Sequence, residues 1–473
     1  MSNDPSKALS AVTAMREDFD LIDDLLGGTK SMRASGVRHL PKFPSEEQDV
    51  YDARLKASTL LPALSKTVEA MTGRVFADAI VLGDDVPPNI QTLTENIDLQ
   101  GNNLQVWAAD FFAKGLAYGL CHVLVDHPRS EGVKTLADEK RLGVRPYAVI
   151  INPKQVIGWR FSAGVLTKFR YFERVDDGGE GFDEVMVDQI RVLEPGAWSV
   201  YRKDSKGQWL LHESGVTSLS IIPLVSFYTK RTGVMTAVPP LLDLANLNVK
   251  HWQSQSDQDN ILHVARVPIL FLAGFDSTDP VTLGSGSALR HSSADAKASY
   301  VEHSGAAIEA GRNALKDLLE EMRMAGAQLL QRDKQTIKTA TQAEEEAAQE
   351  MSPLERMSIA FADALSQVLQ LMAMWQGQPE GGHVEVRGNF DVDFAPEVSL
   401  PSLISMANAG KLSSETLFSE CQRRGIISDE ITWEDERGRI ESEGPDMSSL
   451  PPLPENKPSA ADELIMRELG NGG

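Results

Sequence analysis

The histidines that could do chemistry in this chain gather in two places. His122, Asp126 and His127 are close in sequence, and His251 and His263 flank a polar segment. On a strand, His122 and Asp126 share a face while His127 points to the other, so this segment alone makes a poor three-ligand metal site. His251 and His263 lie twelve residues apart, which is more than three turns of a helix. We therefore predict pairwise hydrogen bonding, at a strand edge for the first group, and no metal site.

Other segments offer only fragments of known chemistry. The run Gly284-Ser285-Gly286-Ser287 lacks the later Gly-Lys-Ser/Thr of a phosphate-binding loop, so it is interpreted as a turn. The sequence contains no Gly-x-Ser-x-Gly elbow and no His-Glu-x-x-His pair. Asp391 and Asp393 alternate on one face of an expected strand, which leaves a metal-dependent nuclease or hydrolase open as the rival class. The main expectation is a protein that is not an enzyme and has no cofactor.

A short polar segment with mixed charge is the most unusual feature. Its charged and polar residues lie between two expected long helices and are Arg332, Asp333, Lys334, Gln335, Thr336 and Lys338. In a monomer this would be an ordinary helix–helix connection. In a ring it could project into the central channel, where lysine and arginine would meet phosphates transiently while the neighbouring acid limits the grip.

Composition excludes several classes of protein. Of 473 residues, 46 are Lys or Arg and 68 are Asp or Glu, giving a net charge of −22, which disfavours tight binding of duplex DNA over a broad face. Cys121 and Cys421 are isolated, as is typical of a reducing compartment. No signal peptide is recognisable, and no uninterrupted apolar run approaches the ~18 residues of a membrane span. We expect a soluble protein made in the cytoplasm.

Hydrophobic periodicity predicts a mixed helix and strand protein. Residues up to about 45 are expected to be a weakly ordered lead-in, broken by Gly27-Gly28 and Gly36. Helices are expected at 61–75 and 104–116 because apolar residues recur there at steps of three and four. Short β-branched and aromatic runs between Arg145 and Tyr228 predict a modest antiparallel sheet.

The second half is expected to be mainly helical. A helix follows Pro239-Pro240, but its segment 253–260 is polar on every side, so it is expected to bridge solvent or line a polar surface. A strand-and-turn module is expected at 266–303, a long helix at 306–331, strands at 384–386 and 390–392, and a short helix near 400–410. From Asp429 onward, 12 Asp/Glu against 4 Lys/Arg, together with Pro451-Pro452-Leu453-Pro454, predict an extended tail.

Two helix starts after the polar segment have capping-box sequences. Thr341 with Glu344, and Ser352 with Glu355, match the Ser/Thr-x-x-Glu pattern, and Pro353 occupies the first helical position of the second. We expect one helix over 342–350 and another from 353 to about 375, with an apolar stripe from Leu354 to Trp375.

These landmarks, in this order, resemble those of a tailed-bacteriophage portal protein. More narrowly they resemble a portal-like phage family catalogued as a domain of unknown function. The resemblance spans about residues 50–425 and leaves out the acidic tail. It depends on short segments in a fixed order, namely 51–54 (Tyr-Asp-Ala-Arg), 72–76 (Thr-Gly-Arg-Val-Phe), 96–101 (Asn-Ile-Asp-Leu-Gln-Gly), 124–128 (Leu-Val-Asp-His-Pro), 156–160 (Val-Ile-Gly-Trp-Arg), 239–248, 325–330 (Ala-Gly-Ala-Gln-Leu-Leu) and 339–341 (Thr-Ala-Thr).

The resemblance implies an α+β fold of the portal type, in eight regions. These are a flexible lead-in (1–45), a mixed helix and sheet wing (46–238), a stem helix (239–265), a small α/β clip (266–304), a second stem helix (305–331), a tunnel loop (332–341), a kinked helix returning to wing and helical crown (342–428), and an acidic Pro-rich tail (429–473).

The function implied is that of a ring at one vertex of the capsid. Double-stranded DNA would be packaged, retained and ejected through it without sequence-specific binding. The implied partners are other copies of the chain, twelve in the usual ring, the major capsid protein, the terminase motor and a tail adaptor, with no membrane. Its place would be the virion. The alternatives are another ring or scaffold component of the virion and the nuclease or hydrolase named above.

Overall fold

The computed structural model describes residues 4–128, 144–178, 182–265, 269–274, 297–301, 306–330, 351–390, 396–423, 426–428 and 431–443. The chain consists of two compact units, Met1–Phe390 and Asp391–Gly473. The boundary between them falls inside 342–428, which the sequence assigns to a single region. Elements of both kinds are present, so the α+β class is confirmed.

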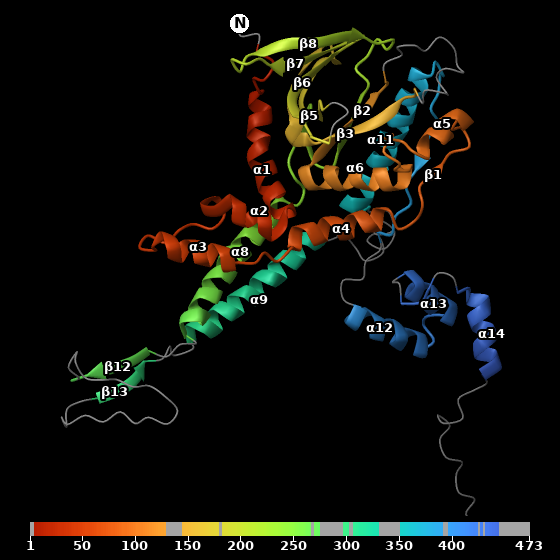
Figure 1. Ribbon diagram of the computed structural model, residues 1–473. Helices are drawn as coiled ribbons and strands as arrows, with labels where there is room; N and C mark the ends of the chain where they lie inside the picture. Colours follow the sequence, from red (N-terminus) through yellow and green to blue (C-terminus); the bar gives the residue numbers. More distant parts are fainter. Residues whose placement is uncertain are drawn as a thin grey trace, which may run out of the picture. The chain divides into compact units, whose positions relative to one another are not determined.

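A three-stranded antiparallel sheet forms the centre of the first unit (Figure 1). Its strands are β2 (Leu120–Asp126), β3 (Tyr147–Ile151) and β9 (Leu224–Tyr228), with β2 in the middle. Helices α6 (Leu104–Tyr118) and α11 (Pro353–Trp375) pack against it. Four buried rings, from Phe111, Phe112, Phe227 and Phe361, meet between these elements with centroids 4.9–5.7 Å apart. Burial of these aromatic rings joins the two helices to the sheet.

A second antiparallel sheet contains five strands in chain order. They are β4 (Val156–Ser162), β5 (Val165–Asp176), β6 (Met186–Glu194), β7 (Ala197–Lys203) and β8 (Trp209–Val216), so β8 is an edge strand. Phe169 and Tyr171 of β5 are buried in the core on one face of this sheet, together with Leu124 of β2. The antiparallel sheet expected between Arg145 and Tyr228 is confirmed.

The expectation of a flexible lead-in over 1–45 is wrong. Residues 10–38 form α1 (Ser10–Leu26), α2 (Gly28–Ser35) and the short 3₁₀ helix η1 (Gly36–Arg38). Phe19 and Ile22 of α1 are buried in the core, and Phe19 meets the ring of Tyr118 edge to face at 5.4 Å. Apolar residues of α1 recur at helical spacing, and the glycine pair that follows them ends one helix without unfolding the segment.

Two long helices form an antiparallel pair in the same unit (Figure 1). They are α8 (Leu242–Ala265) and α9 (Ala306–Ala327), and the chain between them contains the hairpin of β12 (Ile269–Ala273) and β13 (Lys297–Val301). The η3 turn (Gln328–Leu330) follows α9. Helices and strands therefore lie where the sequence predicts the two long helices and the strand module between them.

The remaining elements of the first unit are short. The helices are α3 (Gln48–Ala57), α4 (Ala63–Val75), α5 (Pro88–Thr94) and the 3₁₀ helix η2 (Pro153–Gln155). Two short strand pairs join them: β1 (Val81–Leu82) with β14 (Val384–Glu385), and β10 (Arg231–Gly233) with β11 (Thr236–Ala237). The strand expected at 390–392 reaches beyond the described residues at Asp391.

Helix α11 is long and apolar enough to cross a membrane by length and composition. Eleven of its residues, among them Phe361, Leu365 and Met372, are buried in the core of the first unit. A core helix of this kind passes the same test, so the apolar character of α11 is explained by its packing.

The described part of the second unit contains three helices, α12 (Pro396–Asn408), α13 (Ser414–Arg423) and α14 (Trp433–Glu443). Phe418 and Trp433 bring α13 and α14 together with ring centroids 5.5 Å apart. The prediction of an extended tail from Asp429 is wrong over α14. Thr432 precedes this helix and its hydroxyl oxygen accepts a hydrogen bond from the backbone N–H of Asp435 at 3.2 Å, the arrangement of an N-terminal cap.

Candidate functional site

All residues of the predicted tunnel loop, 332–341, lie outside the part of the chain that the structure describes. Arg332, Asp333, Lys334, Gln335, Thr336 and Lys338 fall in this gap, as do Thr341 and Glu344 of the first capping box. Asp391 and Asp393 of the rival nuclease also fall outside the described residues. The gap begins directly after η3 and ends before α11, so it also contains the helix predicted at 342–350.

The second capping box is formed. The Ser352 hydroxyl accepts the Glu355 N–H at 3.2 Å, and the Glu355 carboxylate accepts the Ser352 N–H at 3.3 Å. Pro353 occupies the first turn, where a missing N–H costs nothing. These hydrogen bonds fix the start of α11 at Ser352.

The α8–α9 pair is held partly by a polar contact. Gln258 of α8 donates from Nε2 to the Ile308 carbonyl of α9 at 3.0 Å. Gly311 provides the space, because a Cβ there would lie 2.1 Å from the Gln258 Oε1 atom. Farther along the pair, Leu315, Leu318 and Met322 of α9 are buried. At the other end, a Cβ on Gly326 of α9 would lie 3.7 Å from the Leu244 side chain of α8.

Other polar residues of α8 bind to the N-terminal helices. Asn248 is fully buried; its amide donates to the Leu61 carbonyl at 2.9 Å and its oxygen accepts the Leu64 N–H at 3.1 Å. Gln253 donates to the His39 carbonyl at 2.9 Å. The prediction that segment 253–260 bridges solvent or lines a polar surface is therefore wrong for Gln253, which satisfies a backbone group inside the subunit, and for the buried Ser256 and Gln258.

A buried ion pair joins α3 to α8. The Arg54 guanidinium forms two hydrogen bonds of 2.8 Å with the two carboxylate oxygens of Glu46, and its Nη2 also donates to the Pro41 carbonyl at 2.9 Å. Its Nη1 reaches the Ser256 hydroxyl of α8 at 3.5 Å. Both charged side chains are at most 5% exposed. The hydrogen bonds from Arg54 hold the pKa of the Glu46 carboxyl below its usual range.

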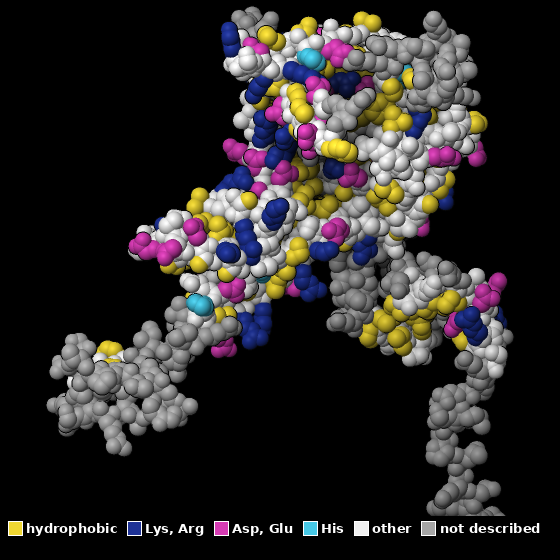
Figure 2. Space-filling model, viewed as in Figure 1, with side chains coloured by type: hydrophobic (Ala, Val, Ile, Leu, Met, Phe, Trp, Pro, Cys, Tyr) yellow, Lys and Arg dark blue, Asp and Glu magenta, His cyan; other side chains and the backbone are white. Residues whose placement is uncertain are grey.

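The outer face of the helix pair carries both signs of charge (Figure 2). Arg312, Lys316 and Arg323 of α9 are exposed, and so are Asp317, Glu320 and Glu321 of the same helix. Cations and anions are neighbours along the helix, as at Lys316 and Asp317, and Arg323 lies 3.4 Å from Glu320. Such a surface interacts weakly with a polyanion, because attraction to the cations is offset by repulsion from the carboxylates.

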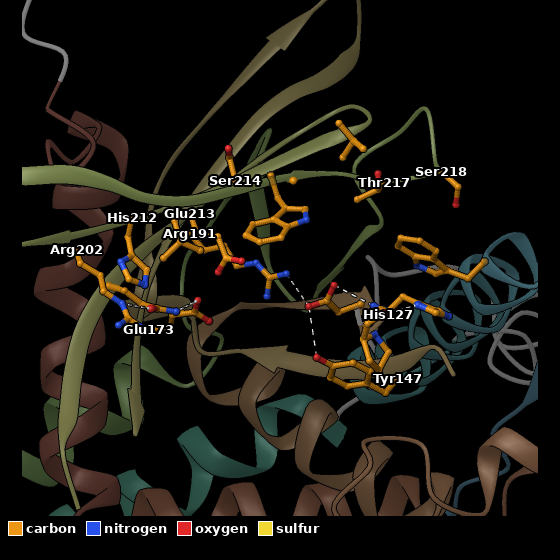
Figure 3. A pocket seen from close by; sticks show the side chains of 18 residues that line it. His127, Tyr147, Glu173, Arg191, Arg202, His212, Glu213, Ser214, Thr217 and Ser218 are labelled. Carbon is orange, nitrogen blue, oxygen red and sulfur yellow. Dashed lines mark hydrogen bonds and ion pairs between the residues drawn. The ribbon is translucent and has the colours of Figure 1, made fainter. Parts of the chain in front are cut away.

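A cavity of about 920 Å³ lies between the two sheets and the end of α11. Figure 3 shows Arg191, Glu173 and Arg202 entering it from the five-stranded sheet and Tyr147 from β3. Trp198 and Trp375 also line it. Arg191 Nη2 donates to Asp126 Oδ2 at 2.7 Å, and its guanidinium lies 5.6 Å from the Trp198 ring centroid. The cavity thus combines aromatic walls with ionic groups.

Electrostatics keep Arg191 charged in this buried position. Burial alone would lower the pKa of Arg191, but Tyr171, Asp126 and Glu173 together raise it above its ordinary value. Burial also raises the pKa of Tyr147 to about 12, and the neighbouring Asp126 carboxylate adds to that shift. The Nε atom of Arg191 is buried without a hydrogen-bond partner in the described part of the protein. One donor in the cavity wall is therefore unused.

The histidines predicted to pair at a strand edge lie elsewhere. His122 is buried on β2, the central strand of its sheet, with Nδ1 2.9 Å from the Ser226 hydroxyl of β9. Burial lowers its pKa to about 3. His127 follows the end of β2 and stacks on Trp375 with ring centroids 5.2 Å apart. His251 is buried and its pKa is lowered by burial, whereas His263 lies at the surface groove between α3 and α8.

No group of three or more His, Cys, Asp or Glu is placed to hold a metal ion among the residues with described positions. Sequence patterns gave no signal for either ion pair. Arg191 and Asp126 are far apart in the sequence, and Glu46, the partner of Arg54, lies in the loop before α3. Arg54 belongs to a segment that carries the resemblance, but its partner does not.

Comparison with known proteins gives one family match. Residues 240–376 match the family model described as "Domain of unknown function (DUF4055)". The resemblance to a family catalogued as a domain of unknown function is confirmed over this segment. It contains α8, β12, β13, α9 and the whole of α11. No curated protein matches the chain.

Three similar chains in solved structures come from gene transfer agent (GTA) particles. One is from the neck of an empty GTA particle computed with C6 symmetry, at 13% identity and a TM-score of 0.38, covering 82% of this chain and 96% of that one. Another is from the virion of a native GTA particle, at 12% identity and a TM-score of 0.37, covering 84% and 98%. The third is from the neck of a native particle computed with C12 symmetry, at 11% identity and a TM-score of 0.35, covering 77% and 89%.

Proposed function

We propose that this chain is the subunit of a phage-type portal, a ring at one vertex of a capsid through which double-stranded DNA passes. Packaging, retention and ejection of the DNA would all use the same channel. The ring would be closed and built from head-to-tail contacts between identical copies, as cyclic symmetry requires.

The observation that carries the proposal is the unit formed by α8, the β12–β13 hairpin and α9. One long helix leads away from the two sheets, a hairpin follows, and a second long helix returns beside the first. The family model covers this unit, and the segments that carry the sequence resemblance flank it. In a portal these parts would be the two stem helices and the clip, to which the packaging motor and later a tail adaptor would dock.

The charge distribution supports a conduit in which DNA slides. The chain has a net charge of −22, and the exposed face of α9 carries interspersed cations and anions. Like-charge repulsion discourages tight binding of the duplex. The 332–341 segment adds Arg332, Lys334 and Lys338 against Asp333, and we assign to it the transient contact with DNA phosphates.

The proposed role is structural and not enzymatic. The hydrolysis of ATP that drives packaging would belong to a separate motor, in line with a sequence that has no Gly-x-x-x-x-Gly-Lys-Ser/Thr loop. The two sheets and their helices would form the wing, in contact with the major capsid protein. The ring would contain twelve copies, the number that the resemblance implies.

Electron microscopy of the purified full chain, with its mass measured by light scattering, tests the proposal. The expected result is a ring with an open axial channel wide enough for a DNA duplex and a mass that is a multiple of 51.7 kDa. A closed disc would favour another ring or scaffold component of the virion. A compact monomer that cleaves DNA when Mg²⁺ is added would overturn the proposal in favour of the nuclease.

A further inference from the structure

We propose that the cavity between the two sheets binds the proline-rich sequence Pro451-Pro452-Leu453-Pro454 of a second copy of this chain. The inference rests on the proposed ring for the choice of a second copy. The site itself is argued from its own side chains.

The walls of the cavity suit proline rings. Three aromatic residues line it, namely Trp198, Trp375 and Tyr147. Trp375 donates from its indole nitrogen to the Val125 carbonyl at 2.9 Å and stacks on His127. Tyr147 lies with its hydroxyl 3.5 Å from Asp126. Proline-rich segments bind to aromatic-lined grooves of this kind because their extended helix is already formed, so little conformational entropy is lost.

The hydrogen-bonding capacity of the cavity also matches such a segment. Proline has no N–H, so a Pro-rich segment presents mainly carbonyl acceptors. The Arg191 side chain is 19% exposed and lines the cavity, so a carbonyl can accept a hydrogen bond from its guanidinium. Asp126 is already paired with Arg191, and Glu173 accepts a hydrogen bond from Gln189 at 2.7 Å. The carboxylates therefore do not require a cation from the ligand.

Size and access are consistent with this ligand. A volume of about 920 Å³ falls in the range of sites that enclose small ligands, ~300–1,000 Å³. The rim includes seven consecutive residues, His212 to Ser218, from β8 and the chain after it. Residues on both faces of β8 line the rim, so the backbone edge of β8 borders the opening. In the described sheet this strand has a neighbour on only one side.

A ring supplies the second copy. In a closed ring each subunit contacts a neighbour through two different patches, so every cavity can receive a segment from the next copy. The sequence has 30 residues after α14. Extended chain spans up to ~3.3 Å per residue, so 30 residues reach at most about 100 Å.

Photo-crosslinking of the full chain tests the inference. The exposed Ser214 on the rim of the cavity is replaced with benzoylphenylalanine, and assembled rings are irradiated. We expect an adduct with the mass of two chains that maps to residues 444–473, and its loss when Pro451, Pro452 and Pro454 are all changed to serine. A synthetic peptide of residues 446–460 in excess should suppress the adduct.

Two controls make the result decisive. Benzoylphenylalanine at Ser205, an exposed turn residue between β7 and β8, should give no adduct with the tail. The blocking variant Ser214→Trp should abolish binding of the peptide measured by calorimetry, without removing any packed side chain. An adduct within one chain, an adduct mapped to another segment, or rings without an adduct each overturn the inference and leave the portal proposal intact. Failure to form rings counts against both.

Discussion

The side-chain amide of Gln258 in α8 donates to the Ile308 carbonyl in α9 across 3.0 Å, beside a glycine at position 311. This contact fixes the two long helices near the hairpin end of the pair. A side chain at position 311 would therefore fit only if the Gln258 side chain moved away or were removed.

Gly311→Ala should have opposite effects on stability in two backgrounds. In the wild type the new methyl displaces the Gln258 amide, and loss of that hydrogen bond, about 1 kcal/mol, cancels or exceeds the gain in helix propensity. In Gln258→Ala the methyl fits, and Gly311→Ala should stabilise by up to about 1 kcal/mol. Denaturant unfolding of the four proteins in this double-mutant cycle measures the coupling. Additive effects would show that the two residues do not interact.

Arg54→Met should destabilise the protein strongly. The change leaves the Glu46 carboxylate buried without its partner, which costs about 3–5 kcal/mol. The matched control is Arg174→Met, because Arg174 is 64% exposed and lies 3.7 Å from Asp188. We expect the control to change the free energy of unfolding by no more than about 0.5 kcal/mol. Equal effects of the two substitutions on chemical unfolding would contradict the structure.

His122 should make the protein less stable as the pH falls below about 6.5. Its pKa is about 3 in the folded protein, so the unfolded chain binds a proton there that the folded protein does not. Stability therefore declines between pH 6.5 and 3 by about 1.4 kcal/mol per pH unit from this group. His122→Gln should remove that part of the decline. The test compares unfolding free energies of both proteins at pH 7 and 5, and an unchanged difference would mean that His122 is not buried as a neutral ring.

Phe19→Ala should cost about 3–5 kcal/mol if α1 is part of the core. Phe161 is 41% exposed, and Phe161→Ala is expected to cost about 1 kcal/mol or less. Thermal unfolding of both variants provides the comparison. A negligible effect of Phe19→Ala on thermal unfolding would contradict the burial of α1 and support a flexible segment over residues 1–45.

Lys334→Gln with Lys338→Gln should impair DNA packaging or retention while rings still assemble. Under the proposed function these lysines contact phosphates and take no part in subunit contacts. The DNA content of particles and electron microscopy of the rings give the two readouts. Lys206→Gln with Lys230→Gln, which removes the same charge at exposed positions, should leave both unchanged. If the loop variant fails to form rings, the assignment of the tunnel loop is wrong.

Local patterns predicted much of the fold. The apolar stripe and capping box of α11 set its bounds at Pro353 and Trp375, and the β-branched and aromatic runs predicted β5, β6 and β7 of the five-stranded sheet but not β4 or β8. These elements depend on neighbours in sequence, so periodicity and capping are sufficient. The sequence also predicted the positions of α8 and α9.

Long-range contacts were not predictable in the same way. The polar segment 253–260 of α8 was interpreted as solvent-facing because nothing in the sequence shows that Gln253 binds the His39 carbonyl, 214 residues earlier. The cavity around Arg191 is likewise assembled from seven separate elements, six strands and α11. The helical lead-in was missed because Gly27-Gly28 was weighed more heavily than the apolar spacing of α1.

The hydrogen bonds from Asn248, Gln253 and Gln258 have a mechanical consequence. Apolar side chains can slide past one another at small cost, but a directional bond is broken when its partner moves by one helical turn, 5.4 Å. Three such bonds, spread over nearly three turns of α8, oppose axial slippage of this helix against both α9 and the N-terminal helices. We therefore expect α8 and α9 to move as one rigid body. A force applied to the hairpin would be transmitted along the helix pair to the sheets and would not make one helix slide past the other.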